Sequence, residues 1–151
     1  MERSEVVKAV RVQQPGPPEA MQFEDLEIGA PGEGEALVRI EAIGLNRAEL
    51  AFRAGGYIAP PSWPARIGYE AAGVLLATGP GVEGFVPGQR VSILPNFNQG
   101  NYGVYAEQAI VPTSITAMAV NDAIQAAAAS TAPSQSGMAI RLEAGTIACS
   151  A

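Results

Sequence analysis

Glycine and proline punctuate this sequence at short intervals, and their spacing most restricts what the chain can fold into. The chain holds 17 glycines and 12 prolines, and most of them fall before residue 113. The runs between them are short and rich in valine, isoleucine and leucine, which is typical of strands. The sequence therefore predicts a mainly β fold, with strands over residues 6–12, 26–28, 38–42, 71–78, 90–94 and 104–111.

One run alternates clearly between apolar and charged side chains. Val38, Ile40 and Ala42 fall on one side of an extended chain, whereas Arg39 and Glu41 fall on the other. Alternation with a period of two is the pattern of a strand with one buried face. We expect the three apolar residues to face the core.

Residues 46–54 break this alternation and predict a short helix. Leu50 and Phe52 are among its apolar residues, and Asn46 is suited to cap its first turn. The glycine pair at residues 55–56 is expected to end it.

The composition excludes several classes of function. The sequence has no histidine and one cysteine, Cys149, so it can form neither a Ser-His-Asp triad, nor a Cys/His metal site, nor an internal disulfide. The net charge of −6 does not favour binding to the phosphate backbone of a nucleic acid. No apolar stretch reaches the roughly 20 residues that a membrane helix requires, and the first residues do not resemble a signal peptide. We therefore expect a cytoplasmic protein with an inert thiol and with neither nucleic-acid nor membrane partners.

Residues 79–84 match the dinucleotide-binding pattern G-x-G-x-x-G, but their surroundings do not fit it. In that fingerprint the glycines open a helix whose free amides bind a pyrophosphate. Here Pro87 and Gly88 follow almost at once, and no helical run begins before Arg90. We interpret the motif as a glycine-rich turn between two strands.

Several short motifs follow one another in a fixed order. They are I-G-L-N-R-A-E-L at residues 43–50 with R-A-G-G-Y at 53–57, G-Y-E-A-A-G-V at 68–74, G-P-G-V-E-G-F at 79–85 with P-G-Q-R-V at 87–91, and Y-G-V-Y-A-E at 102–107. Together they resemble the catalytic, GroES-like domain of the medium-chain dehydrogenase/reductase superfamily, and the first group looks like its zinc-independent quinone oxidoreductase branch. The resemblance implies a GroES-like, partly open β-barrel with a few short helices over residues 1–120.

Zinc-dependent members of this superfamily carry a cysteine in the first motif and a histidine in the second as metal ligands. This sequence has Asn46 and Tyr69 at those positions, so the resemblance implies a metal-free protein. Glu70, the next residue in the second motif, matches the family. It is interpreted either as a carboxylate that lines the cleft or as a buried structural hydrogen-bonding group.

The resemblance implies an NAD(P)H-dependent oxidoreductase, with NADP as the expected cofactor, that passes hydride to a quinone or an enone. By position, Asn46 and Tyr57 are the candidate catalytic residues, and Asn46 is also the candidate contact to the cofactor. Tyr69 and Glu70 are the candidate substrate-binding residues. An amide can both donate and accept a hydrogen bond, and a phenol can pack on a flat ring and donate one.

These residues also have structural interpretations that the sequence leaves open. Asn46 can serve as a helix cap alone, Tyr57 can fill a loop after the two glycines, and Tyr69 can pack in the core. Trp63 is interpreted as a lid over one end of the barrel rather than as a ligand platform.

Residues 121–151 depart from the family pattern. They predict a helix over 122–129, a weaker helix or turn over 136–143 and a strand over 146–151, which is too little chain for a doubly wound nucleotide-binding domain. The last strand is either a remnant of the crossover to an absent Rossmann domain or a segment that closes the barrel. We therefore expect the substrate-side domain of an oxidoreductase that does not catalyse hydride transfer alone. The alternative is a non-catalytic β-barrel module that binds a partner or self-associates, and an oligomer is expected.

Overall fold

The computed structural model describes residues 5–56, 62–95, 99–118, 139–143 and 146–149. Within them the fold is mainly β with a few short helices, as the sequence predicts. The strands are β1 (Glu5–Val12), β2 (Met21–Ile28), β3 (Glu35–Gly44), β4 (Ala65–Arg66), β5 (Glu70–Thr78), β6 (Arg90–Ile93), β7 (Gln108–Pro112), β8 (Thr116–Met118), β9 (Ala139–Glu143) and β10 (Thr146–Cys149). The helices are α1 (Arg47–Arg53), α2 (Gln99–Tyr102) and two 3-10 turns, η1 (Pro18–Ala20) and η2 (Thr113–Ile115).

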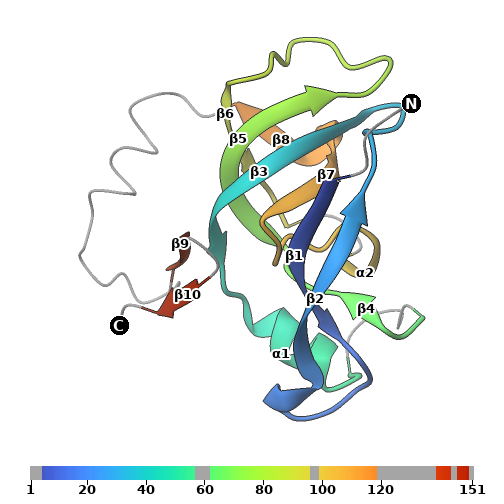
Figure 1. The fold of residues 1–151 in the computed structure, drawn as a ribbon, viewed down its shortest axis with the longest axis vertical. Coiled ribbons are helices and arrows are strands. Elements are labelled where there is room, and N and C mark those ends of the chain that lie inside the picture. The colour runs from blue at the N-terminus through green and yellow to red at the C-terminus, as the bar shows by residue number, and fades with distance from the viewer. Residues whose placement is uncertain (1–4, 57–61, 96–98, 119–138, 144–145, 150–151) are drawn as a thin grey trace.

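The strands form two sheets (Figure 1). The smaller has the order β2-β1-β4, and the larger has the order β10-β9-β3-β5-β6-β8, with β7 also paired to β3. Every one of these pairings is antiparallel, unlike the parallel sheet of a nucleotide-binding domain. The larger sheet curls into a half-barrel, which confirms the fold class that the resemblance implies.

Most of the predicted strands are confirmed, but two segments differ from the prediction. Residues 104–107, predicted as part of a strand, lie before β7 and form only one isolated bridge, between Ala106 and Ala9. Residues 139–143, predicted as helix or turn, form β9 instead, because their alternating apolar and charged residues pair with β10 and β3. The predicted helix over 122–129 lies outside the described residues.

β3 alternates as predicted as far as Ile40 and then changes phase. Val38 and Ile40 are buried, but Ala42 is only half-buried and Ile43 is buried in its place. In the pairing with β5, Glu41 has no opposite residue, which makes it the extra residue of a β-bulge. The prediction that Ala42 faces the core is therefore wrong, because a bulge shifts the alternation by one residue.

Two clusters of buried side chains form the core. The larger cluster fills the curled sheet, and its fully buried members include Val38, Leu75, Val91, Ile93, Val104 and Val111. The smaller cluster packs α1 against the small sheet, and its buried members are Val10, Val12, Phe52, Ala65 and Ile67. Full burial of one such side chain stabilises the fold by about 1.5–3 kcal/mol.

Residues 104–107 join the two sheets through main-chain hydrogen bonds. The Val10 N–H donates to the Tyr105 carbonyl at 2.7 Å, and the Glu107 N–H donates to the Lys8 carbonyl at 2.9 Å. The Glu107 carbonyl in turn accepts an N–H of β3 at 2.9 Å. The segment therefore holds the small sheet against the large one and fixes the position of Tyr105.

The glycine-rich residues 79–84 form a turn, as predicted. Every residue between β5 and β6 is described, and none is helical. Gly81 and Gly84 have φ values of +74° and +78°, which residues with a Cβ rarely adopt. Gly79 lies so close to the main chain of Gly32 that a Cβ would overlap it. The motif therefore allows two segments to approach closely, and it does not start a dinucleotide-binding helix.

β9 and β10 form a hairpin beside β3. β9 pairs with residues 42–44 of β3, whereas β7 pairs with residues 35–39. One edge of β3 is therefore shared by two strands, and β10 lies beyond β9 at the end of the sheet.

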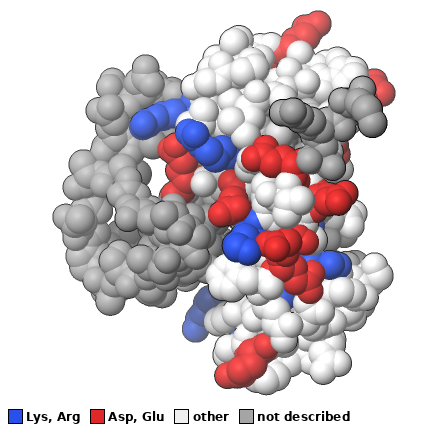
Figure 2. All heavy atoms as spheres, in the orientation of Figure 1, with Lys and Arg blue, Asp and Glu red and all other residues white. Residues whose placement is uncertain are grey.

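The face over β1 and β2 mixes charges of both signs. Lys8 Nζ lies 2.7 Å from Asp25 Oδ1, and Arg11 Nη1 lies 3.0 Å from Glu24 Oε2. Figure 2 shows acidic and basic side chains interspersed on this face, without a continuous basic patch. Among the helices that the structure describes, none is long and apolar enough to cross a membrane.

Candidate functional site

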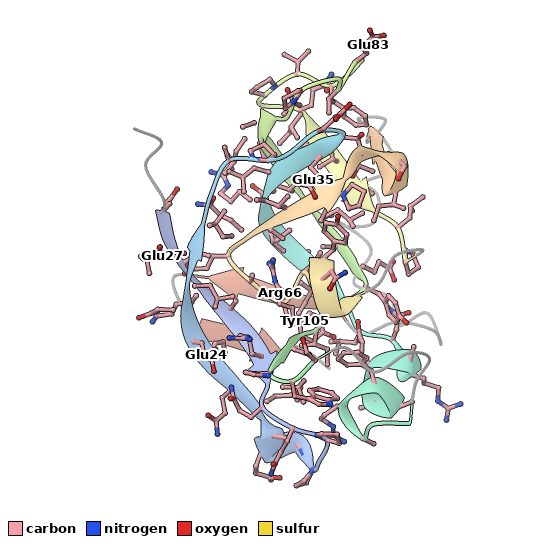
Figure 3. All side chains as sticks on the ribbon, turned by 90° about the vertical axis from the view of Figure 1, so that its right-hand side faces the viewer. Glu24, Glu27, Glu35, Arg66, Glu83 and Tyr105 are labelled. Carbon is pink, nitrogen blue, oxygen red and sulfur yellow. The ribbon has the colours of Figure 1, made fainter. Side chains whose placement is uncertain are left out.

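Polar groups of the side chains and the main chain meet where β3 ends, α1 begins and β5 begins. We call this cluster the polar junction, and its members are Asn46, Glu49, Tyr69, Glu70 and Tyr105. Tyr105 comes from the segment that joins the two sheets, and it lies in the interior of the molecule (Figure 3). The cluster therefore links residues from three separate stretches of the chain.

α1 begins as the sequence predicts, with Asn46 as its N-cap. The Asn46 main chain is extended, and its N–H donates to Glu49 Oε2 at 2.7 Å. A glutamate three residues after the cap commonly accepts this N–H. Gly55, with a φ of +80°, follows the last turn, so the predicted helix end is also confirmed.

Glu49 is a buried carboxylate that accepts three hydrogen bonds. Only 4% of the residue is exposed. Its Oε1 accepts the Tyr69 N–H at 3.0 Å, and its Oε2 accepts both the Asn46 N–H and the Tyr105 hydroxyl, each at 2.7 Å. These bonds offset part of the unfavourable removal of a charge from water. Glu49 thereby ties the start of α1 to the start of β5.

Tyr105 is held in a neutral, hydrogen-bonded state. Burial, and then its hydrogen bond to the Glu49 carboxylate, raise the pKa of the Tyr105 phenol above its ordinary value. The ring packs against Gly68, which has a φ of +108°, and a Cβ at that position would lie 2.9 Å from Tyr105 N. The absence of a side chain at Gly68 therefore makes room for the phenol.

Asn46 and Glu70 form the accessible part of the polar junction. Asn46 Nδ2 donates to Glu70 Oε2 at 3.2 Å; Asn46 is half-buried and Glu70 is exposed. Glu70 is opposite Gly44 in the sheet, and a Cβ on Gly44 would lie 2.9 Å from Glu70 Cδ. The carboxylate therefore folds across Gly44 to reach the amide.

The structure brings together three of the four site residues predicted from the sequence. Asn46, Tyr69 and Glu70 all belong to the polar junction, whereas Tyr57 lies outside the described residues. Glu70 is exposed, so the interpretation of a buried structural carboxylate is wrong. Only 7% of Tyr69 is exposed, which agrees with a packing role.

Trp63, interpreted from the sequence as a lid over one end of the barrel, packs on α1. Its ring centroid lies 5.5 Å from that of Phe52, with the two rings tilted by 49°. Half-buried, it joins the edge of the smaller core cluster.

The sequence interpretation missed the roles of Glu49 and Tyr105. The spacing of Glu49 from Asn46 is that of a capping box, which could have identified Glu49 as the partner of the cap. Tyr105 carries no comparable local signal, because it meets Glu49 across 56 residues of sequence.

The side chains that these hydrogen bonds bring together are one amide, two carboxylates and one phenol, and this set does not fit zinc. Zinc in proteins prefers thiolate and imidazole ligands, and the sequence has no histidine and one cysteine. Across the part of the chain that the structure describes, no three His, Cys, Asp or Glu side chains form a group that could hold a metal ion. The chemistry available here is hydrogen bonding to a polar group on a ligand, and Asn46 is the residue best placed to touch one.

The comparisons with known proteins agree with this geometry. The alcohol dehydrogenase GroES-like domain family matches residues 32–122. The quinone oxidoreductase of Rattus norvegicus is 31% identical over 112 residues, which cover 74% of this chain and 33% of the relative. The 2-haloacrylate reductase of a Burkholderia species is 33% identical over 112 residues, which cover 71% of this chain and 32% of the relative. The chain thus spans about a third of the length of these curated relatives.

Solved structures give the same result. The quinone oxidoreductase of Pseudomonas syringae superposes with a TM-score of 0.70 at 33% identity, over 77% of this chain and 34% of the other. A mycobacterial protein solved in complex with NADPH superposes with a TM-score of 0.67 at 35% identity, over 76% of this chain and 34% of the other. The family match covers more than half of the chain and includes β3, β5 to β8 and the polar junction. The chain therefore belongs to the alcohol dehydrogenase GroES-like domain family and, within the medium-chain dehydrogenase/reductase superfamily, is similar to the quinone oxidoreductases.

Proposed function

We propose that this chain forms the substrate-side wall of a zinc-independent, NADPH-dependent oxidoreductase that reduces a quinone or an enone. The observation that carries the proposal is the pair formed by Asn46 Nδ2 and Glu70 Oε2 at 3.2 Å. The pair lies at an accessible part of the barrel, in the two motifs where zinc-dependent relatives hold their metal. An amide oriented by a carboxylate replaces the metal as the group that can contact a carbonyl.

Asn46 has the task of orienting the substrate. Its amide nitrogen has two N–H groups, so the hydrogen bond that Glu70 accepts sets the direction of the other. The second N–H would donate to the carbonyl oxygen of the quinone or enone, which draws electron density from the carbon that receives hydride. The bound nicotinamide supplies the hydride. Tyr57 is a second candidate donor, and we assign Tyr69 to packing because of its burial.

Binding of duroquinone to the isotope-labelled chain tests the role of Asn46. We expect the side-chain amide resonances of Asn46 to shift as the quinone is added. The variant Asn46→Ser keeps a capping side chain but removes the amide, and should weaken binding about tenfold, the equivalent of about 1.4 kcal/mol. The variant Asn101→Ser, at an exposed position, is the matched control and should bind as the parent does. Equal affinity in all three proteins would refute the assignment.

Gly44 offers a second test of the same pair. An alanine there would push the Glu70 carboxylate away from Asn46. Because Glu70 is exposed, Gly44→Ala should change the stability little while it weakens duroquinone binding. Unchanged binding with a displaced Glu70 would show that the carboxylate does not orient the amide.

We further propose that residues 1–151 do not transfer hydride on their own and need a nucleotide-binding domain. In support, the one glycine motif of dinucleotide-binding type forms a turn between strands. Titration of NADPH against the fluorescence of Trp63 should show no saturable change, and NADPH absorbance should stay constant with duroquinone present. Turnover by the purified chain that Asn46→Ser abolishes would contradict this part of the proposal.

A second candidate function is self-association through β10. This strand is the outermost strand of the larger sheet, and its sequence, T-I-A-C, has neither charge nor proline. By contrast, the edge strand β2 carries three acidic residues, which discourage pairing with another chain. Sedimentation velocity should show a concentration-dependent dimer that Ala148→Lys dissociates. A monodisperse monomer at high concentration would exclude this function.

A further inference from the structure

Two arginines of the small sheet face each other away from the polar junction. Arg66 on β4 is directly opposite Arg11 on β1. Like charges in this position repel each other, which weakens the pairing of the two strands. The arrangement therefore requires negative charge close by.

Arg11 has its own partners. Its Nη1 donates to Glu24 Oε2 at 3.0 Å and its Nη2 donates to the Pro64 carbonyl at 2.7 Å. The other carboxylate oxygen of Glu24, Oε1, accepts the side-chain amide of Gln13. Both oxygens of Glu24 are therefore engaged, and this carboxylate is not shared with Arg66.

Arg66 has no such partner. Its Nε and Nη2 atoms are both buried and donate to no acceptor among the described residues, and no salt bridge among these residues includes Arg66. In a guanidinium group the N–H bonds of Nε and Nη2 point in the same direction, and this edge binds the two oxygens of a carboxylate or phosphate side-on. The two unsatisfied donors are thus the two that make a bidentate site. Arg11 Nε, also buried and unpartnered, offers a third donor nearby.

The electrostatics agree with the hydrogen-bond geometry. Burial, and then the charge of Arg11, lower the pKa of Arg66, but a guanidinium keeps its proton at any physiological pH. Arg66 therefore cannot lose its charge to relieve the unfavourable burial, whereas a bound anion can compensate it. In the view of Figure 3, Arg66 lies near the centre, whereas Glu24 and Glu27 lie at one edge.

We propose that an oxyanion, either a phosphate or a carboxylate, binds side-on to Nε and Nη2 of Arg66, with Arg11 Nε as an additional donor. Because Glu24 already pairs with Arg11, the anion supplies the negative charge that Arg66 lacks, and it thereby stabilises the pairing of β1 with β4. This site does not depend on the oxidoreductase activity, and the chemistry of the ligand is that of a free phosphate or of a carboxylate-bearing metabolite.

Thermal unfolding in inorganic phosphate tests the site. In phosphate, compared with chloride at the same ionic strength, the midpoint of the parent chain should rise and saturate, because a ligand that binds only the folded state stabilises it. Arg66→Met should lose this dependence and, in chloride, should unfold at the same or a higher temperature than the parent. Arg53→Met is the matched control, since Arg53 has a single buried unpartnered nitrogen, Nε, and should keep the full response. A parallel titration with acetate separates a phosphate site from a carboxylate site.

The Nε resonance of Arg66 gives a readout that does not depend on the stability of variants. This resonance should shift when phosphate or acetate is added to the parent chain. Arg66→Lys keeps the charge but loses the bidentate edge, and it should weaken the binding of the anion at least about tenfold. Two results would overturn the proposal. One is an equal phosphate response in the parent and in Arg66→Met, which indicates a general effect of salt. The other is an Arg66 Nε resonance that neither anion moves, which indicates that water alone fills the site.

Discussion

At the residue scale, the hydrogen bond between the Tyr105 hydroxyl and the Glu49 carboxylate links α1 to the segment that joins the two sheets. Removal of the phenol hydroxyl in Tyr105→Phe leaves one fewer donor to the buried carboxylate of Glu49. Hydrogen bonds to charged groups contribute about 1.5–3 kcal/mol, so we expect a loss of that order in the free energy of unfolding. Urea denaturation at neutral pH measures it, and a loss below about 0.5 kcal/mol, the usual range for surface positions, would mean that the contact is not formed.

The same variant predicts a difference in pH dependence. The folded-state pKa of Tyr105 is raised, whereas an unfolded tyrosine titrates at about 10. The contribution of this group to stability is therefore complete below about pH 10 and falls as the pH rises through the interval between the two pKa values. The stability of the parent should decline more steeply above pH 10 than that of Tyr105→Phe, which urea denaturation across the alkaline range will show. Parallel curves would contradict the raised pKa.

Gly68 is required by two constraints at once. Its φ of +108° disfavours any side chain, and a Cβ would meet both the ring and the main chain of Tyr105. We expect Gly68→Ala to destabilise the fold by at least about 2 kcal/mol. Gly29, which has nothing within 4 Å of an added Cβ, is the control, and Gly29→Ala should change the stability by less than about 0.5 kcal/mol. Calorimetry of the two variants separates a specific requirement from a general effect of alanine.

At the scale of the element, α1 is short and depends on its first turn. Its seven residues are too few for a stable isolated helix, so it persists because Phe52 is buried and Glu49 ties it to β5. Glu49→Ala leaves three donors without their acceptor and should destabilise the protein by at least about 3 kcal/mol. The control is Glu41→Ala, which removes an exposed carboxylate paired with Arg39. It should change the free energy of unfolding by less than about 0.5 kcal/mol. Similar losses in the two variants would argue against the structural role of Glu49.

The elements whose pattern is local were predictable from the sequence. The N-cap of α1, its glycine end and the turn at residues 79–84 depend on residues that are close in the chain, and each was predicted correctly. The bulge at Glu41 and the strand at residues 139–143 were not, because both depend on the register with a neighbouring strand. Local pattern does not carry that information.

At the scale of the whole molecule, the β9–β10 hairpin and β7 divide the free edge of β3 between them. A variant that lacks residues 139–151 should therefore lose protection from hydrogen exchange in one half of the strand. Amides of residues 42–44 that point toward β9 should exchange about tenfold faster or more, while those of residues 35–39, which pair with β7, should keep their rates. A uniform loss of protection from hydrogen exchange along β3 would indicate that the hairpin stabilises the entire sheet.

The polar junction shows which part of a site can be predicted from the sequence. Asn46, Tyr69 and Glu70 were found because the family motifs mark them, and the fold brings Asn46 and Glu70 together across 24 residues. Glu49 and Tyr105 also lie in these motifs, but their hydrogen bonds depend on how α1 packs against the start of β5 and against residues 104–107. The motifs therefore mark the residues of the junction, whereas the contacts between them follow only from the fold.

The bulge gives β3 one residue more than its pairing with β5 requires. Ile40 and Ala42 lie opposite Gly73 and Ala72, which are adjacent in β5, so the pairing skips Glu41. Deleting Glu41 would therefore leave a regular strand, in which Ile43 still lies opposite Ala71 and Gly44 still lies opposite Glu70. This strand can thus lose a residue at one position without separating the Asn46 amide from its carboxylate partner.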